Sequence, residues 1–316
     1  MSEAGVATEL GHIEIAHGEQ RVSVVALGGG LRSYEAAGRE LLNGFPPGER
    51  PASGRGQVLV PWPNRIEDGS YEFGGKRMQL PLSEPENGNA IHGLVRGATW
   101  SLVDHEPDRV VLEYTLEPQP GYPFTLGLSI EYALSSAGLT VTTTAWNLGS
   151  GHCPYGAGQH PYLSLGTPTI DTLRLQAPGR VVMFSDERGL PTRSTPVDGT
   201  EYDFRAGREI AETVLDHAFT ELERDTDGRA RVLLDDVAGE SGLTLWVDNS
   251  YRYLMLYTGD SHPDVARRGL AVEPMTCPPN AFRTGESVIR LEPGESVASS
   301  WGLEPRLAAE GVPDGR

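Results

Sequence analysis

The sequence predicts an all-β protein, and three observations lead to that prediction. First, Gly (39) and Pro (24) together make up about a fifth of the 316 residues and are spread along the whole chain, which is typical of many short strands joined by turns. Second, apolar residues alternate with polar ones over 126–132 and again over 139–145, on either side of a turn at 135–138, which indicates a hairpin with one buried face. Third, no stretch has the periodicity of an amphipathic helix, so we expect helices to be few and short.

The first strands are expected between residues 12 and 43, where Val22, Val24 and Ala26 alternate before the turn at 28–30. The three glycines of that turn lack the spacing of a phosphate-binding loop, and no apolar helix follows them. A nucleotide-binding function is therefore not indicated here.

An apolar strand at 57–60 is stopped by prolines and followed by Asn64 and Arg65. Asn64 offers a donor and an acceptor together, and Arg65 offers a rigid fork of donors, which suits binding to several hydroxyl groups of a polyol. The alternative is that Arg65 forms a surface ion pair with Glu67 or Asp68.

A histidine, His92, follows between Gly88 and Gly93. Glycine at such a position would let a ligand approach the backbone closely, although a histidine after a turn is also often structural. Trp100, farther along, is expected in the core.

Two side chains with acid/base chemistry directly precede prolines: His160 precedes Pro161, and Glu273 precedes Pro274. Because proline has no N–H for a sheet ladder and biases the preceding residue toward extended backbone, we expect a strand to end at Glu273, with the carboxylate at its rim. The prolines after Glu273 would stiffen its support. On local grounds alone, Glu273 could instead be a solvated edge residue.

The segment 176–213 is rich in turn residues and is predicted to be an insertion or a long loop. Asp216 follows it and would accept hydrogen bonds from hydroxyls, orient a histidine or cap a turn. Later strands are expected at 243–247, 253–259, 288–291 and 296–301. The last two would form a hairpin that closes the fold, and the residues after Pro305 would form a frayed tail.

The formal charge of −18 argues against nucleic acid and anionic membrane surfaces as partners and favours a small molecule. Cys153 and Cys277 are too few for a disulfide framework and do not form a spaced metal-binding set. Residues 1–9 contain no basic leader, and no apolar run is long enough to span a membrane. We therefore expect a soluble, cytoplasmic protein.

Seven short motifs occur in one order over roughly residues 10–305. They are Asn64-Arg65-Ile66, His92-Gly93, Gly121-Tyr122-Pro123, His160-Pro161-Tyr162, Asp216-His217-Ala218-Phe219, Tyr257-Thr258-Gly259 and Glu273-Pro274. Together they resemble the aldose 1-epimerases, or galactose mutarotases. The residues after Glu273 look like the bacterial branch that includes mutarotases of sulfosugar pathways. The galactose enzymes commonly have a second glycine after His-Gly, where this chain has Leu94, so galactose is not assumed as the substrate.

The resemblance implies a large antiparallel β-sandwich of the galactose mutarotase type, as one domain over 1–316 with a core of about 10–305 and short flexible termini. It also implies site roles. His160 resembles the general acid and Glu273 the general base. The residues that resemble sugar-binding groups are Asn64, Arg65, His92 and Asp216. No metal or organic cofactor is implied, the partner is a small-molecule sugar, and we expect a monomer or weak homodimer.

Interconversion of sugar anomers needs one base and one acid, and each typically contributes ~10²–10⁴-fold to the rate. Closeness of His160 and Glu273 would favour their charged forms, whereas desolvation in a cleft would oppose them. The sequence leaves open which effect is larger.

The same residues leave three other functions open. A glycoside hydrolase would need two carboxylates at one bond, for which Asp216 and Glu273 are the available pair, and His160 would be unexplained. An epimerase for an anionic sugar, sulfoquinovose or a hexose 6-phosphate, would use Arg65 and Arg96. A non-catalytic carbohydrate-binding protein on the same fold would have no use for an acid and a base together.

Overall fold

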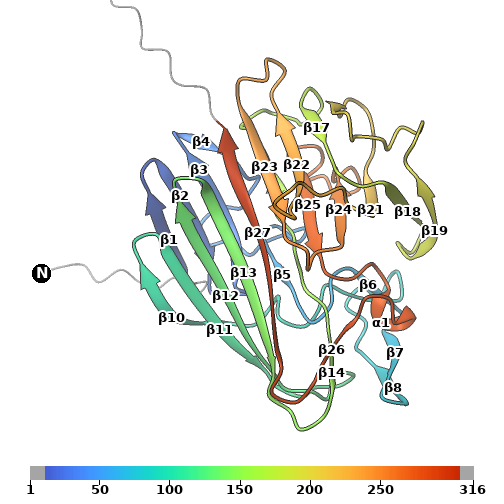
Figure 1. Cartoon of the computed structure of the whole chain (residues 1–316). Coiled ribbons are helices and arrows are strands. Elements are labelled where there is room, and N and C mark those ends of the chain that lie inside the picture. The colour runs from blue at the N-terminus through green and yellow to red at the C-terminus, as the bar shows by residue number, and fades with distance from the viewer. Residues whose placement is uncertain (1–10, 307–316) are drawn as a thin grey trace, which may run out of the picture.

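The computed structural model describes residues 11–306, and it is built almost entirely of antiparallel strands (Figure 1). The described residues contain three larger sheets and three two-stranded pairs. The described part of the chain contains one helix, the short α1 (Ala281–Thr284). The predictions of an all-β fold and of few, short helices are confirmed.

The largest sheet has nine strands. In order across the sheet they are β10 (Ser101–Glu106), β11 (Arg109–Leu116), β12 (Leu126–Ser135), β13 (Gly138–Asn147), β27 (Ser296–Arg306), β23 (Gly242–Val247), β22 (Ala230–Asp235), β17 (Arg174–Gln176) and β20 (Arg208–Glu209). Strands β12 and β13 form the predicted hairpin, and their side chains alternate between buried and half-buried along most of their length. This alternation turns one face of the sheet toward the core.

The second sheet has eight strands and contains the residues of the candidate site. Its order is β19 (Pro191–Pro196), β18 (Val181–Ser185), β21 (Asp216–Thr220), β24 (Tyr253–Tyr257), β25 (Leu270–Met275), β15 (Gly158–Gln159) and β5 (Val58–Leu59), and β16 (Tyr162–Leu163) also pairs with β25. Strand β25 is central and buried along its whole length, as expected of a strand covered on both faces.

Smaller sheets complete the fold. A four-stranded sheet contains β1 (His12–His17), β2 (Gln20–Val25), β3 (Gly30–Ala36) and β4 (Arg39–Glu40). The two-stranded pairs are β14 (Cys153–Tyr155) with β26 (Ile289–Leu291), β6 (Arg65–Glu67) with β9 (Asn89–Ile91), and β7 (Ser70–Phe73) with β8 (Lys76–Gln79).

One continuous core joins the three larger sheets. It includes Val24 of the four-stranded sheet, Leu128 of the nine-stranded sheet and Val272 of the eight-stranded sheet. Trp100 also belongs to this core, as predicted. A buried polar connection crosses the same core: Gln159 accepts a hydrogen bond from Trp301 Nε1 at 3.1 Å and donates one to Tyr132 Oη at 2.8 Å. The two large sheets are therefore fixed to each other directly beside His160.

Two predictions about the second half of the chain are wrong. The segment 176–213 is not one long loop, because it contains the hairpin of β18 and β19 and the short strand β20. The segments near 288–291 and 296–301 do not pair with each other: β26 pairs with β14, whereas β27 pairs with β13 and β23.

The expected absence of a leader at residues 1–9 lies outside the described residues, as does most of the expected tail. Strand β27 continues through Pro305 to Arg306, so the tail does not begin directly after Pro305. Within 11–306, no helix is both long and apolar enough to cross a membrane.

Candidate active site

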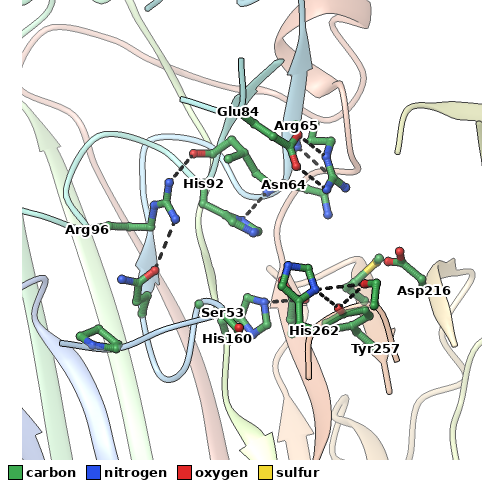
Figure 2. A pocket seen from close by; sticks show the side chains of 17 residues that line it. Ser53, Asn64, Arg65, Glu84, His92, Arg96, His160, Asp216, Tyr257 and His262 are labelled. Carbon is green, nitrogen blue, oxygen red and sulfur yellow. Dashed lines mark hydrogen bonds and ion pairs between the residues drawn. The ribbon is translucent and has the colours of Figure 1, made fainter. Parts of the chain in front are cut away.

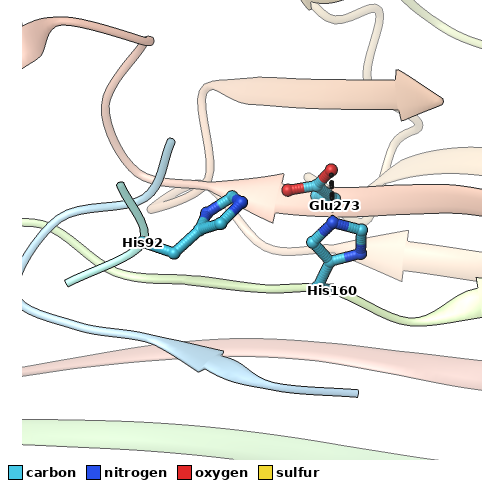
Figure 3. A group of neighbouring side chains, drawn as sticks. All are labelled: His92, His160 and Glu273. Atoms are coloured by element: carbon cyan, nitrogen blue, oxygen red, sulfur yellow. Dashed lines mark ion pairs between the residues drawn. The ribbon is translucent and has the colours of Figure 1, made fainter. Parts of the chain in front are cut away.

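A cavity of about 290 Å³ is lined by side chains of the eight-stranded sheet and of the loops beside it (Figure 2). Its walls include all six residues that the sequence singled out: Asn64, Arg65, His92, His160, Asp216 and Glu273. Three of them lie together at its floor (Figure 3) and are nearly inaccessible to solvent, with exposed fractions of 2% for Glu273, 5% for His160 and 8% for His92. The fold thus brings together residues that are far apart in the sequence.

Glu273 projects from the interior of β25, where its backbone neighbour across the ladder is Met255 of β24. Its carboxylate oxygen Oε1 lies 3.3 Å from His160 Nε2. The other oxygen, Oε2, is buried and has no hydrogen-bond partner among residues 11–306. One half of this carboxylate is therefore without a protein partner in the described part of the chain.

The strand does not end at Glu273, contrary to the sequence-based prediction. It continues through Pro274 to Met275, and Pro274 lies opposite Leu254 of β24. The N–H of Val272 donates to Pro161 O on the other side of β25. Backbone N–H groups of alternate residues point to the same side of a strand, so the nitrogen of Pro274 points to the same side as that of Val272. On that side the neighbouring strand is interrupted between β15 and β16, and no ladder hydrogen bond is needed there. A missing N–H is tolerated at this position.

His160 occupies that interruption, between β15 and β16. Its backbone is held on both sides by the loop before β5, since its N–H donates to Gln57 O at 3.1 Å and its carbonyl accepts from Gly56 N at 2.9 Å. Its ring stacks on Tyr162, with centroids 5.0 Å apart and planes 19° from parallel. These contacts fix the imidazole next to Glu273.

His92 has a left-handed backbone (φ 59°), as does Asn64 (φ 55°), and the two segments bond to each other. His92 N–H donates to Asn64 O at 2.9 Å, and Asn64 N–H donates to His92 Nδ1 at 3.2 Å. Because Nδ1 accepts this bond, neutral His92 carries its proton on Nε2 and is a hydrogen-bond donor. The next residue is Gly93, and a Cβ at this position would lie 2.0 Å from Val60 O. The group that approaches Gly93 closely is therefore the backbone of Val60, whereas the sequence-based interpretation expected a ligand there.

Arg65 pairs with neither Glu67 nor Asp68, the two partners considered from the sequence. Its guanidinium forms a bidentate pair with Glu84, with both N–O distances 2.8 Å. Gly189, in the turn after β18, lies against the guanidinium, and a Cβ there would come within 2.3 Å of Nη1. Arg65 is thereby held rigidly in the cavity wall, and Glu84 is a site residue that the sequence analysis missed.

Asp216 and Arg96 lie at opposite parts of the cavity wall (Figure 2). Asp216 is the first residue of β21 and is exposed. Arg96 donates to Ile91 O at 3.1 Å and to Gln57 Oε1 at 3.5 Å. Among the described residues, no carboxylate forms an ion pair with Arg96.

Burial sets the electrostatics of the floor. It lowers the pKa of His160 to about 3, with smaller contributions from the charges of Arg96 and His262. Burial, together with the charge of Asp216, raises the pKa of Glu273 well above its ordinary value, and Arg65 acts in the opposite direction. Desolvation is therefore the larger effect, and it favours the neutral pair in which Glu273 holds the proton.

His92, His160 and Glu273 also form the one group of three or more metal-ligating side chains within 11–306, with their ligand atoms within 4.8 Å of one another. A metal would need the lone pair of His92 Nε2, because Nδ1 already accepts the bond from Asn64. That nitrogen carries the proton in the neutral ring, so the arrangement favours hydrogen bonding to an oxygen-rich ligand over metal coordination.

The sequence matches the model of the aldose 1-epimerase family over residues 11–303. It is 34% identical over 284 residues to the uncharacterized protein YihR of Escherichia coli (strain K12), covering 90% of this chain and 89% of that protein. Among solved structures, a GalM/aldose epimerase homologue from C. elegans has a TM-score of 0.84 at 20% identity, covering 95% of this chain and all of that one. Galactose 1-epimerase from Lactobacillus acidophilus NCFM has a TM-score of 0.81 at 22% identity, covering 98% of each chain.

The structural likeness confirms the predicted galactose mutarotase-like β-sandwich. The match of the family model extends over nearly all of the described residues, including every residue that lines the cavity floor. The chain therefore belongs to the aldose 1-epimerase family.

Proposed function

We propose that this protein is a mutarotase that interconverts the α and β anomers of an aldohexose by general acid/base catalysis. The proposal rests on one observation above all, the 3.3 Å contact between His160 Nε2 and Glu273 Oε1 at the floor of the cavity. An acid and a base held this close can act on two oxygens of one sugar ring. A cavity of about 290 Å³ is of the size expected for a small ligand.

In the proposed reaction, Glu273 as carboxylate takes the proton of the anomeric hydroxyl O1, and His160 as imidazolium gives a proton to the ring oxygen O5. The C1–O5 bond breaks, C1 becomes an aldehyde, and rotation about C1–C2 presents its other face. The steps then run in reverse: O5 attacks C1 and returns its proton to His160, and Glu273 returns its proton to O1. No net proton is gained or lost.

Burial assists the ring-opening step. Because it raises the pKa of Glu273 and lowers that of His160, the carboxylate is a stronger base and the imidazolium a stronger acid than either would be in water. After ring opening, both groups are neutral, which is the form that burial favours. The charged and neutral pairs contain the same number of protons, so one transfer between Nε2 and Oε1 interconverts them.

The remaining cavity residues would bind and orient the ring. His92 would donate from Nε2 to a sugar oxygen where negative charge develops. Asn64 would contribute amide hydrogen bonds, Arg65 would donate from its fixed guanidinium, and Asp216 would accept from hydroxyls.

A mutarotation screen with the purified protein tests this function. Freshly dissolved α-D-glucose, α-D-galactose, other neutral aldoses and sulfoquinovose would be followed by polarimetry or NMR. We expect at least one aldose to equilibrate much faster than in buffer, in proportion to protein concentration. A protein that binds a sugar by calorimetry but accelerates none would be the non-catalytic binding protein, and the proposal would be wrong.

A second candidate function, epimerisation of an anionic sugar, is favoured by Arg96. A half-buried guanidinium with no carboxylate partner among the described residues is costly unless an anion compensates it, and a sulfonate or phosphate on the sugar would do so. Sulfoquinovose would then have a higher kcat/KM than glucose, and Arg96→Ala would remove that preference. Equal kcat/KM values for the two sugars, together with no change in selectivity in Arg96→Ala, would exclude this candidate.

A further inference from the structure

A loop between β24 and β25, residues 259–268, carries His262 to the mouth of the cavity (Figure 2). His262 is solvent-exposed, yet its side chain forms part of the cavity wall. It also lines an adjoining hollow of about 510 Å³, whose wall shares Arg65 and Asp216 with the cavity. The imidazole therefore lies where the two hollows meet.

The loop that presents His262 is firmly held. His262 N–H donates to Gly259 O at 2.8 Å, and its carbonyl accepts from Val265 N at 3.0 Å and Ala266 N at 2.9 Å. Val265 is fully buried and packs in a small cluster with Tyr162, the residue that stacks on His160. These contacts fix the backbone position from which the His262 side chain projects.

The tip of the same loop is fastened to the segment on the other side of the cavity mouth. Ser53 Oγ donates to both carboxylate oxygens of Asp264 at 3.1 Å, and Arg55 Nη2 donates to Asp264 O at 2.6 Å. Both Ser53 and His262 line the cavity. The loop is thus part of the rigid wall of the site.

Two hydroxyl groups lie beside one nitrogen of the His262 ring. Its Nδ1 lies 2.7 Å from Tyr257 Oη and 3.0 Å from Ser261 Oγ, and these two oxygens lie 2.9 Å apart. One arrangement that uses all these contacts has Ser261 donating to Tyr257 and Tyr257 donating to Nδ1. In that arrangement neutral His262 carries its proton on Nε2, and Nε2 is the ring nitrogen left for a ligand.

We propose that His262 is a substrate-binding residue that donates a hydrogen bond from Nε2 to a sugar oxygen at the mouth of the cavity, with Tyr257 and Ser261 orienting the ring. The proposal rests on the proposed function, since it assumes that the ligand is a sugar with its anomeric carbon at Glu273. The mouth-side oxygens are then those away from the reacting centre, so His262 contributes to affinity and selectivity more than to the chemical step.

Two substitutions distinguish a hydrogen bond donated by His262 Nε2 to the ligand from a purely structural role of His262. In His262→Gln the side-chain amide nitrogen can occupy roughly the position of Nε2, whereas in His262→Asn it lies nearer to Nδ1. Both variants remove the ring. His105→Asn is the matched control, because His105 is exposed on β10 in the other large sheet.

The measurements are KM and kcat for mutarotation of D-glucose and D-galactose, and the calorimetric Kd of the same sugars. We expect His262→Asn to raise KM and Kd by about five- to tenfold, the value of one hydrogen bond, with kcat changed less than about twofold. His262→Gln should lose less than about threefold, and His105→Asn should match the wild type.

Equal losses in His262→Gln and His262→Asn, or wild-type KM and Kd in His262→Asn, would overturn the proposal. If the wild-type protein binds sugar without accelerating mutarotation, the proposed function fails, and the Kd values still decide the role of His262. If neither sugar binds the wild type, both proposals fail for these ligands.

Discussion

The Glu273 carboxyl occupies a position that is unfavourable for a charge. It is almost completely buried, one of its oxygens has no partner within the described residues, and the nearby Asp216 opposes its ionisation. Such an arrangement has no evident benefit for stability, whereas it suits a group that must accept and return a proton. His160, with its pKa lowered by the same burial, is the group that we propose as the matching acid.

Glu273→Gln should lower kcat for mutarotation by roughly 10²–10⁴-fold, because the amide is similar in shape but cannot accept the proton. His160→Ala should cause a loss of the same order. Both are measured by polarimetry on freshly dissolved sugar, with circular dichroism to confirm that the fold is retained. Glu72→Gln, on the exposed side of β7, is the control. Wild-type rates in Glu273→Gln would rule out the assigned base.

The pH dependence of kcat follows from the two opposite shifts. Activity needs one proton shared by the pair, so on the acid side it is lost as His160 becomes protonated with Glu273 already neutral, near pH 3. On the alkaline side it is lost as the pair releases its proton through the raised pKa of Glu273. We expect the loss of kcat on the acid side to be centred near pH 3. A loss of kcat on acidification that is centred near 6.5, the ordinary imidazole value, would contradict the lowered pKa of His160.

For single residues, the sequence predicted site positions where a side chain of suitable chemistry also belonged to one of the ordered motifs. The six predicted residues line one cavity, and their assigned roles remain predictions. Glu84 and His262 had no comparable signal. Glu84 is identified only by its pairing with Arg65, and His262 only by a loop whose path depends on contacts of Asp264 with Ser53 and Arg55.

At the scale of elements, strand ends are less important to the site than a gap inside the sheet. β15 and β16 are two short pieces separated by His160 and Pro161, and both pair with β25. Pro161 lies within the gap, and the nitrogen of Pro274 faces it. The gap also places His160 beside Glu273. The rule that proline stops a strand led to the wrong end for β25, because it takes no account of which side of the strand lacks a partner.

Gln159 ties this gap to the nine-stranded sheet, and Gln159→Ala tests its importance. The change leaves Trp301 Nε1 buried without its partner and removes one of the two hydrogen bonds of Tyr132 Oη, which keeps its bond to Gly29 O. This should cost about 1–3 kcal/mol of folding free energy and displace the adjacent His160. We expect a lower melting temperature together with a reduced kcat. Gln176→Ala, an exposed position on β17, is the control, and an unchanged kcat and melting temperature in Gln159→Ala would contradict the anchoring role.

Local pattern explains which elements could be predicted. The β12–β13 hairpin has its partner a few residues away, so alternation and a turn sufficed. The final strand β27 pairs instead with β13 and β23, and no local feature indicates partners so distant in the sequence. Segment 176–213 was mistaken for a loop because β18 has two adjacent buried residues and β19 and β20 have none, so none of them shows the alternation that identifies a strand.

For the molecule as a whole, the buried acid should reduce stability in a pH-dependent way. The pKa of Glu273 is raised in the folded state, so its contribution to stability is fully present below its unfolded pKa and is lost as the pH rises through the folded pKa. A neutral amide avoids this loss.

Glu273→Gln should therefore melt at a higher temperature than the wild type, and by more at pH 8 than at pH 5. A gain of about 1–2 kcal/mol would correspond to roughly 1.5–3 °C, measurable by differential scanning fluorimetry. Glu72→Gln should show no such pH-dependent gain. A Glu273→Gln protein that melts below the wild type at pH 8 would indicate that the ionised carboxylate stabilises the fold.

The position of His160 beside Glu273 has an evolutionary implication. The separation of the two side chains is set by β25 and by the short strands that flank His160, whereas residues around 84–96 and 259–268 supply other parts of the cavity wall. Insertions or substitutions in those segments would change the shape of the cavity without altering that separation. If the proposed function is right, relatives with this architecture can accept different sugars while keeping the same acid and base.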